Sequence, residues 1–195
     1  VTFHGPMALA AFTEYTQKHF REALFGTAPL GELTNPPESN VLRPNHTLRT
    51  VCGGTARGPL TGGNLSLVVT TLGTPYEIDT RGRILFLEDV GEEPYRIDRM
   101  LTHMHLAGKL SQAAGIIWGE CNDCTVRKYD PGFESSFSTG EVVDRILGRL
   151  RVPVLSGLTI GHTSDQLTLP LGVMAMLDAG KGRLVIEEAA VRAHG

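Results

Sequence analysis

The chain has 195 residues, of which 41% are hydrophobic and 20% are charged, and its formal net charge is −3. These values are ordinary for a globular protein with one good core, and no run of Lys and Arg suggests a nucleic-acid partner. No apolar stretch is long enough to span a membrane, so a membrane protein is not expected. Because the chain begins at Val1 rather than Met, we expect a fragment or a processed chain.

The first 45 residues are predicted to be a tail, a helix and a linker. Pro6 suits the first position of a helix, and apolar spacing continues that helix to about Phe25. Residues 26–46 are rich in Pro, Gly and Asn, which is typical of a connection between domains. We therefore expect residues 1–45 to precede a separate domain of residues 46–195.

A glycine-rich stretch follows a predicted strand at residues 48–52. Its spacing matches neither a P-loop nor a dinucleotide-binding motif, so we expect a loop whose glycines permit close backbone approach or positive φ. Asn64 is a candidate cap for a short helix at residues 65–72. Gly63 and Asn64 could alternatively line a substrate cleft.

The stretch from residue 83 to residue 108 is the most informative in the chain. An apolar run at residues 84–87 predicts a buried strand, and Pro94 suits the start of a helix with apolar residues at helical spacing. Glu88 still belongs to the end of the strand, where function collects in α/β folds. Three neighbouring acids are predicted to be solvated turn residues: Asp89, Glu92 and Glu93.

The second half of the chain continues the alternation of strands and helices. Apolar runs predict strands at residues 114–118 and 152–155, and Ser138 with Glu141 has the spacing of a capping box at the start of the helix between them. Two parallel βαβ units result. The connection Ala-Gly-Lys-Gly predicts a terminal hairpin of two further strands, residues 173–177 and 183–187. The predicted fold class is α/β with a mixed sheet.

The three cysteines are Cys52, Cys121 and Cys124. Their odd number argues against a secreted disulfide framework. Cys121 and Cys124 form a lone C-x-x-C, which is an incomplete ligand set for zinc. We expect no bound metal and, in a reducing compartment, no disulfide between them.

Glu88 and His162 are the candidate catalytic pair. His162 lies in the long segment of residues 156–172, after the strand at 152–155. Both side chains could therefore project into one crevice at the carboxyl edge of the sheet. A carboxylate that fixes an imidazole is the arrangement of an acyl-transfer triad, although a histidine in a loop is also a common structural residue.

Four segments resemble the LD-carboxypeptidase family of serine peptidases: VTFHGPM, RGPLTGGNLSLVVTTLGTPYEID, LFLEDVGEEPYRIDRML and GLTIGHTSDQLTLPLG. The resemblance implies the family's C-terminal domain, of the swivelling β/β/α kind. It also implies hydrolysis of an amide bond between an L- and a D-amino acid, as in murein tetrapeptide recycling in the cytoplasm. Glu88 and His162 would be the catalytic Glu and His, with no cofactor and no metal.

The chain departs from the family pattern because it contains no Gly-x-Ser-Asp turn, where the family carries its nucleophile. We therefore expect the nucleophile domain to be the missing partner and the chain to be inactive alone. The resemblance also allows a homodimer. Two alternatives stay open: a microcin-immunity peptidase that cleaves a peptide–nucleotide toxin, and a non-catalytic interaction module.

Overall fold

The protein is built around a mixed β-sheet. The computed structural model describes residues 1–37, 46–127 and 137–192. Within these ranges the sheet has eight strands in the order β2, β10, β9, β4, β5, β6, β7, β3. Their bounds are β2 Gly31–Leu33, β3 Arg49–Cys52, β4 Thr55–Asn64, β5 Ile84–Glu88, β6 Gly115–Gly119, β7 Val154–Leu158, β9 Met174–Asp178 and β10 Arg183–Ile186. Strands β4 to β7 are parallel, and the outer strands pair antiparallel.

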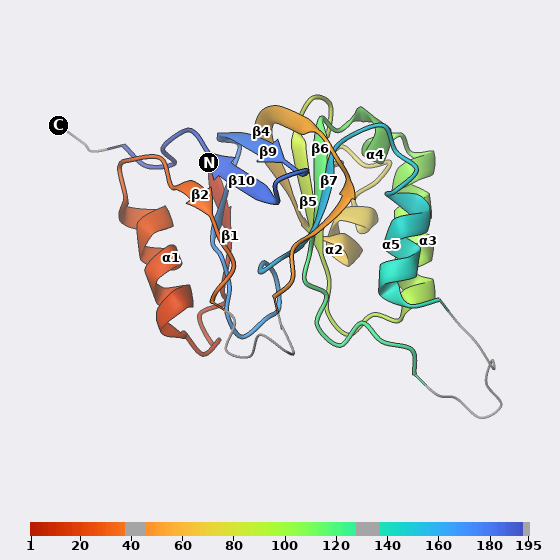
Figure 1. Ribbon diagram of the computed structural model, residues 1–195, viewed down its shortest axis with the longest axis horizontal. Helices are drawn as coiled ribbons and strands as arrows, with labels where there is room; N and C mark the ends of the chain where they lie inside the picture. Colours follow the sequence, from red (N-terminus) through yellow and green to blue (C-terminus); the bar gives the residue numbers. More distant parts are fainter. Residues whose placement is uncertain (38–45, 128–136, 193–195) are drawn as a thin grey trace.

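Most of the helices lie on one side of the sheet. One side carries α2 Leu65–Thr70, α3 Pro94–Leu106, α4 Lys109–Gln112 and α5 Thr139–Ile146. Figure 1 shows α3 and α5 side by side there, and α1 Glu14–Phe25 at the opposite end of the molecule. A separate antiparallel pair, β1 Thr2–His4 with β8 Leu169–Leu171, lies on the α1 side. In the part of the chain that the structure describes, no helix is long and apolar enough to cross a membrane.

Strand β5 contributes to two hydrophobic clusters, one on each face. Leu85 and Leu87 pack with the helices α3 and α5. Ile84 and Phe86 pack in the other cluster, which contains residues of β8 to β10. Because successive side chains of a strand point to opposite faces, Glu88 lies on the same face as Phe86, away from α3. This alternation sets the direction of the candidate catalytic carboxylate.

The predicted α/β fold, with its βαβ units and terminal hairpin β9–β10, is confirmed. The helix α3 begins at Pro94 as predicted. The Asn64 side chain caps α2 by accepting a hydrogen bond from the backbone of Leu67. Ser138 and Glu141 form the predicted capping box of α5. These features depend on residues close in sequence, which is why the sequence predicts them.

The predicted start of the first helix at Pro6 is wrong, because α1 begins at Glu14. Thr13 is its N-cap and accepts a hydrogen bond from the backbone of Thr16 at 3.2 Å. The same Thr13 hydroxyl donates to Asp165 Oδ1 at 2.5 Å, which lies far along the chain. A proline permits a helix start, but this capping group and its distant partner fix where the helix begins.

The glycine-rich stretch is a strand, β4, so the predicted loop is wrong. Its glycines do permit close backbone approach, as expected. A Cβ at Gly58 would lie 2.2 Å from the carbonyl oxygen of Gly82, and one at Gly62 would lie 1.9 Å from that of Phe86. The absence of side chains therefore lets β4 pack against its neighbours, whereas composition alone suggested a loop.

The predicted linker at residues 26–46 contains β2, which pairs antiparallel with β10. Beyond β2, the Asn35 amide donates to the carbonyl oxygens of His46 and Gly157 at 3.0 and 2.7 Å. These contacts attach the stretch to the edge of the sheet. Residues 38–45, and residues 128–136 of the predicted polar loop at 125–137, lie outside the described residues. The domain division after residue 45 stays a prediction.

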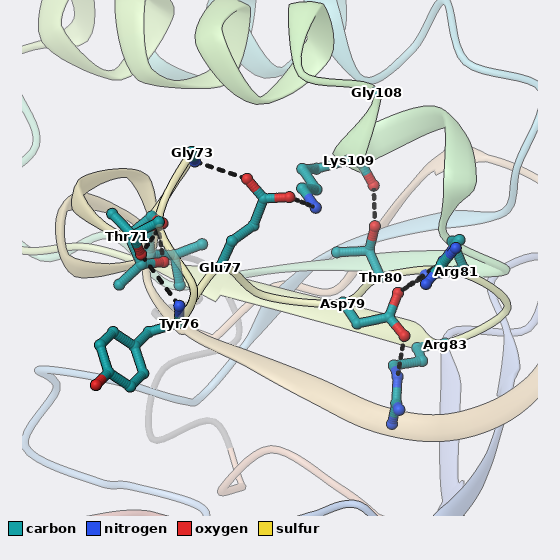
Figure 2. Close-up of polar contacts among 12 residues, drawn as sticks. Thr71, Gly73, Tyr76, Glu77, Asp79, Thr80, Arg81, Arg83, Gly108 and Lys109 are labelled. Carbon is teal, nitrogen blue, oxygen red and sulfur yellow. Dashed lines mark hydrogen bonds and ion pairs between the residues drawn. The ribbon is translucent and has the colours of Figure 1, made fainter.

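The amino end of β5 is held by a polar cluster at the end of the sheet opposite Glu88 (Figure 2). The largely buried Lys109 ammonium pairs with Glu77, which also accepts a hydrogen bond from the backbone of Gly73. The hydrogen bond from Lys109 holds the pKa of Glu77 below its usual value. Thr80 donates to the carbonyl oxygen of Lys109 at 2.7 Å. This cluster connects α4 to the segment before β5 and is structural.

Candidate active site

Glu88 is the last residue of β5 and its side chain is fully buried. In the parallel register, Glu88 lies opposite Asn64 at the end of β4. The carboxyl ends of the parallel strands therefore meet at this edge, as expected for an α/β site. Burying an ionised carboxylate is costly unless polar groups compensate for the lost water. A buried carboxylate at this edge of the sheet therefore indicates a functional site.

His162 lies against Glu88. Its Nδ1 is 3.0 Å from Glu88 Oε2, although 74 positions separate the two residues in sequence. An ionised carboxylate can only accept, so Nδ1 carries the proton and Nε2 is left as the basic nitrogen. The His162 side chain is 44% exposed, whereas that of Glu88 is 0% exposed. A buried carboxylate thus orients an accessible imidazole.

Gly161 makes this approach possible. Its φ is +90°, and a Cβ at this position would lie 2.0 Å from Glu88 Oε2. Both the backbone conformation and the space therefore require glycine. The backbone of the loop passes directly over the carboxylate and presents the next side chain, His162, to it.

The first turn of α1 holds the His162 loop from the other side. Thr13 bonds Asp165, as described above, and the Thr16 hydroxyl accepts a hydrogen bond from the backbone of Gln166 at 2.9 Å. Gln166 in turn donates its side-chain amide to the carbonyl oxygen of Thr163 at 2.8 Å. The start of α1 is therefore part of the support of the candidate site.

A cavity of about 340 Å³ opens beside the pair and is lined by both His162 and His4, together with Met7, Thr163, Ser164 and Gln166. A larger hollow of about 600 Å³ lies along α1 among Phe12, Phe20 and Phe25. Size alone would favour the larger hollow. The smaller cavity is the better candidate because it contains the oriented imidazole.

Comparison with known proteins identifies the family of this chain. The sequence model of the LD-carboxypeptidase C-terminal domain matches residues 57–177. The chain is also 40% identical over 192 residues to a Bacillus subtilis (strain 168) protein named "Probable murein peptide carboxypeptidase", covering 96% of this chain and 56% of that protein. The chain belongs to the LD-carboxypeptidase family.

Other relatives of this LD-carboxypeptidase chain carry two kinds of name. The Escherichia coli protein named "Microcin C7 self-immunity protein MccF" is 29% identical, over 96% of this chain and 59% of that protein. Among solved structures, a muramoyltetrapeptide carboxypeptidase from Oxalobacter formigenes has a TM-score of 0.75 at 30% identity. MccF in complex with aspartyl sulfamoyl adenosine has a TM-score of 0.78 at 26% identity. The chain covers 61% of each of these two structures.

The acids next to Glu88 have other partners. Asp89 is 2% exposed and accepts hydrogen bonds from the backbone and hydroxyl of Ser66, at the start of α2, and from the Asn64 amide. Glu93 is also buried, and Glu92 pairs with Arg96 at 3.6 Å. The prediction that these acids are solvated is therefore wrong for Asp89 and Glu93. Asp89 follows the strand onto the α2 side, where the N-terminus of that helix favours an anion.

Gly63 and Asn64 lie where the sequence placed them, at the edge of the sheet beside Glu88. The Asn64 side chain both caps α2 and donates to Asp89 Oδ1 at 3.0 Å. These two bonds account for its structural role. A role of Gly63 or Asn64 in substrate binding stays a prediction.

His4 is a residue of the site that the sequence reasoning missed. The segment VTFHGPM was interpreted as a tail, but β1 places His4 Nε2 3.9 Å from Glu88 Oε1. Burial lowers the pKa of His4 and outweighs the attraction of Glu88, and the neighbouring His162 lowers it further. The signal that could have found it is a histidine in a segment that the family resemblance included.

Cys121 and Cys124 form a disulfide, with their Cα atoms 5.6 Å apart. The expectation of free thiols, made for a reducing compartment, is wrong for this structure. The reasoning rested on an incomplete set of metal ligands, which does not bear on the pairing of two sulfurs. The turn after β6 brings them together, and its Asn122 carbonyl accepts a hydrogen bond from the backbone of Gly91 at 2.9 Å.

Replacing Gly161 by alanine is expected to destabilise the protein and to separate Glu88 from His162. The positive φ costs about 1–3 kcal/mol for a non-glycine residue, and the methyl group adds a clash with the buried carboxylate. Gly172→Ala is the matched control, since Gly172 has a φ of +89° and open space around its Cβ. Urea unfolding should show the larger loss for Gly161→Ala. Equal losses would show that the carboxylate does not occupy this position.

Proposed function

We propose that this chain is the Glu- and His-bearing part of a serine-type LD-carboxypeptidase. The observation that carries the proposal is the 3.0 Å contact between His162 Nδ1 and the buried Glu88 carboxylate. This contact fixes the imidazole with Nε2 basic, which is what a general base for a serine hydroxyl requires. The family membership supports hydrolysis of a peptide bond as the reaction.

In the proposed reaction, His162 Nε2 takes the proton of a serine hydroxyl as the oxygen attacks the scissile carbonyl. His162 then gives this proton to the leaving amine, and a water molecule releases the acyl group by the same two proton transfers. Glu88 does not change protonation. It holds His162 in the tautomer with Nδ1 protonated and stabilises the imidazolium that forms.

The serine is proposed to lie in a nucleophile domain outside these 195 residues. The sequence contains no Gly-x-Ser-Asp turn, and the chain spans 56% of the Bacillus subtilis relative. The oxyanion hole would lie in the same domain. We call the protein that carries both parts the two-domain protein. The chain alone is therefore expected to be inactive.

The proposed substrate is a murein tetrapeptide, cleaved at an amide bond between an L- and a D-amino acid in the cytoplasm. The murein peptide relative is 40% identical to this chain, whereas MccF is 29% identical. A peptide–nucleotide substrate of the microcin kind is the second candidate, because the MccF structure aligns with a TM-score of 0.78.

The experiment compares the two-domain protein with the 195-residue chain on a murein tetrapeptide and on a peptidyl sulfamoyl adenosine. We expect the two-domain protein to release the C-terminal D-amino acid, and the chain alone to release none. Faster cleavage of the nucleotide substrate would favour the second candidate. Turnover by the chain alone would overturn the placement of the nucleophile. No turnover of either substrate by the two-domain protein would favour a non-catalytic module.

A further inference from the structure

The second oxygen of the Glu88 carboxylate, Oε1, does not take part in the contact with His162. Oε2 bonds His162, but Oε1 is buried and receives no hydrogen bond from any described residue. A buried carboxylate oxygen without a donor is costly, and such an atom in a folded protein requires an explanation. The polar groups around Oε1 therefore need to be identified.

His4 is placed to interact with this oxygen. Its Nε2 is 3.9 Å from Oε1, and its side chain is 21% exposed. The ring packs against Phe86, two residues before Glu88, with 5.1 Å between ring centroids. In the antiparallel register of β1 and β8, His4 lies opposite Leu169, close after the His162 loop. The fold thus holds His4, on β1, against β5 and β8, next to the catalytic pair.

We propose that His4 is a positioning residue, whose ring N–H faces Glu88 Oε1 and holds the carboxylate aligned for His162. The catalytic consequence rests on the proposed function, but the contact between the two side chains does not. The separation of 3.9 Å is longer than a direct hydrogen bond, so in this structure the interaction is one between an ion and a dipole. A small movement of either side chain would make it a hydrogen bond.

A neutral imidazole suits this role better than a cation. Burial lowers the pKa of His4, so the ring is neutral near pH 7 and offers an N–H without a positive charge. A cation there would repel the imidazolium that forms on His162 during the reaction. The titratable groups that act on His4 are Glu88 on β5 and His162 in the loop after β7, with opposite effects on its pKa.

The first test follows the histidine rings of the 195-residue chain by NMR, with ring nitrogens labelled. In Glu88→Gln, the attraction that raises the pKa of His4 is lost, so this pKa should fall further below its value in the unmodified chain. An unchanged titration of His4 would overturn the proposal, because it would show that His4 does not sense Glu88. This measurement changes no residue of β1 and does not depend on enzymatic activity.

The second test compares His4→Leu, which removes the donor, with His4→Gln, which keeps one. His162 should remain in the tautomer with Nδ1 protonated in His4→Gln and become a mixture in His4→Leu. His103→Leu, an exposed position on α3, is the control for loss of a histidine. An unchanged His162 tautomer in folded His4→Leu would overturn the proposal. If His4→Leu does not fold, the titration of His4 in Glu88→Gln still tests whether His4 interacts with Glu88.

The two-domain protein links the contact to the reaction. His4→Leu should lower kcat by about tenfold or more with little change in KM, the size expected for an outer partner of a catalytic group. His4→Gln should restore kcat. An inactive two-domain protein would contradict the proposed function and leave the NMR tests of His4 intact.

Discussion

Replacing His162 by alanine in the two-domain protein is expected to remove nearly all turnover, a loss of about 10⁴- to 10⁶-fold in kcat. The physical reason is that, among the residues that the structure describes, no other basic group is held at the position of His162 Nε2. The nearby His4 has its Nε2 3.9 Å from the opposite oxygen of Glu88, so it cannot take over the role. Steady-state release of the D-amino acid measures the effect.

Folding should survive this change, because the His162 side chain is 44% exposed and its loss leaves no core cavity. His105→Ala, at an exposed position on α3, is the matched control and should keep normal turnover. Circular dichroism and thermal unfolding of both variants would exclude a loss of structure. Near-normal activity of folded His162→Ala would refute the general-base role.

The second large effect is expected for Glu88→Gln, which should lower kcat by about 10³- to 10⁴-fold. An aspartate-to-asparagine change in the catalytic triad of serine proteases has an effect of similar size. An amide of the same shape can turn its NH₂ group toward His162 Nδ1 and so favour the wrong tautomer. It also cannot stabilise the imidazolium. Because Glu88 is fully buried, the neutral amide fills the same space and the fold should persist.

Asp89→Asn tests whether the correct carboxylate has been chosen. Asp89 is the next residue and is also buried, but it bonds the start of α2 through Ser66. We expect this variant to lower the stability and to change kcat by much less than Glu88→Gln. The reverse ranking of the two variants in kcat would transfer the orienting role to Asp89.

The local elements around the site could be predicted because their signals lie within a few residues. The apolar run before Glu88 is β5, Pro94 opens α3, and Ser138 with Glu141 caps α5. Each depends on backbone hydrogen bonds and apolar spacing inside one short segment. The same logic placed Glu88 at the carboxyl end of a parallel strand, and the structure brings His162 to it.

Other features required contacts between distant segments. The start of α1 is fixed by Thr13 together with Asp165, and the glycines of β4 make a strand only because neighbouring backbones approach them. Asp89 is buried because it bonds α2. Local sequence patterns carry no information about such distant partners. The predictions at these positions were based on local composition, and they were wrong.

The sequence by itself therefore determined the order of strands and helices and the presence of a carboxylate and an imidazole at strand ends. Only the tertiary structure decided which neighbours these groups have. Gly161 passes over Glu88, and β1 brings His4 to the other side of the same carboxylate. The physical reason is that a buried charge is stabilised by the polar groups that the fold places within a few ångströms. Here the pairing of β1 with β8, two segments far apart in the sequence, places the His4 ring beside the Glu88 carboxylate.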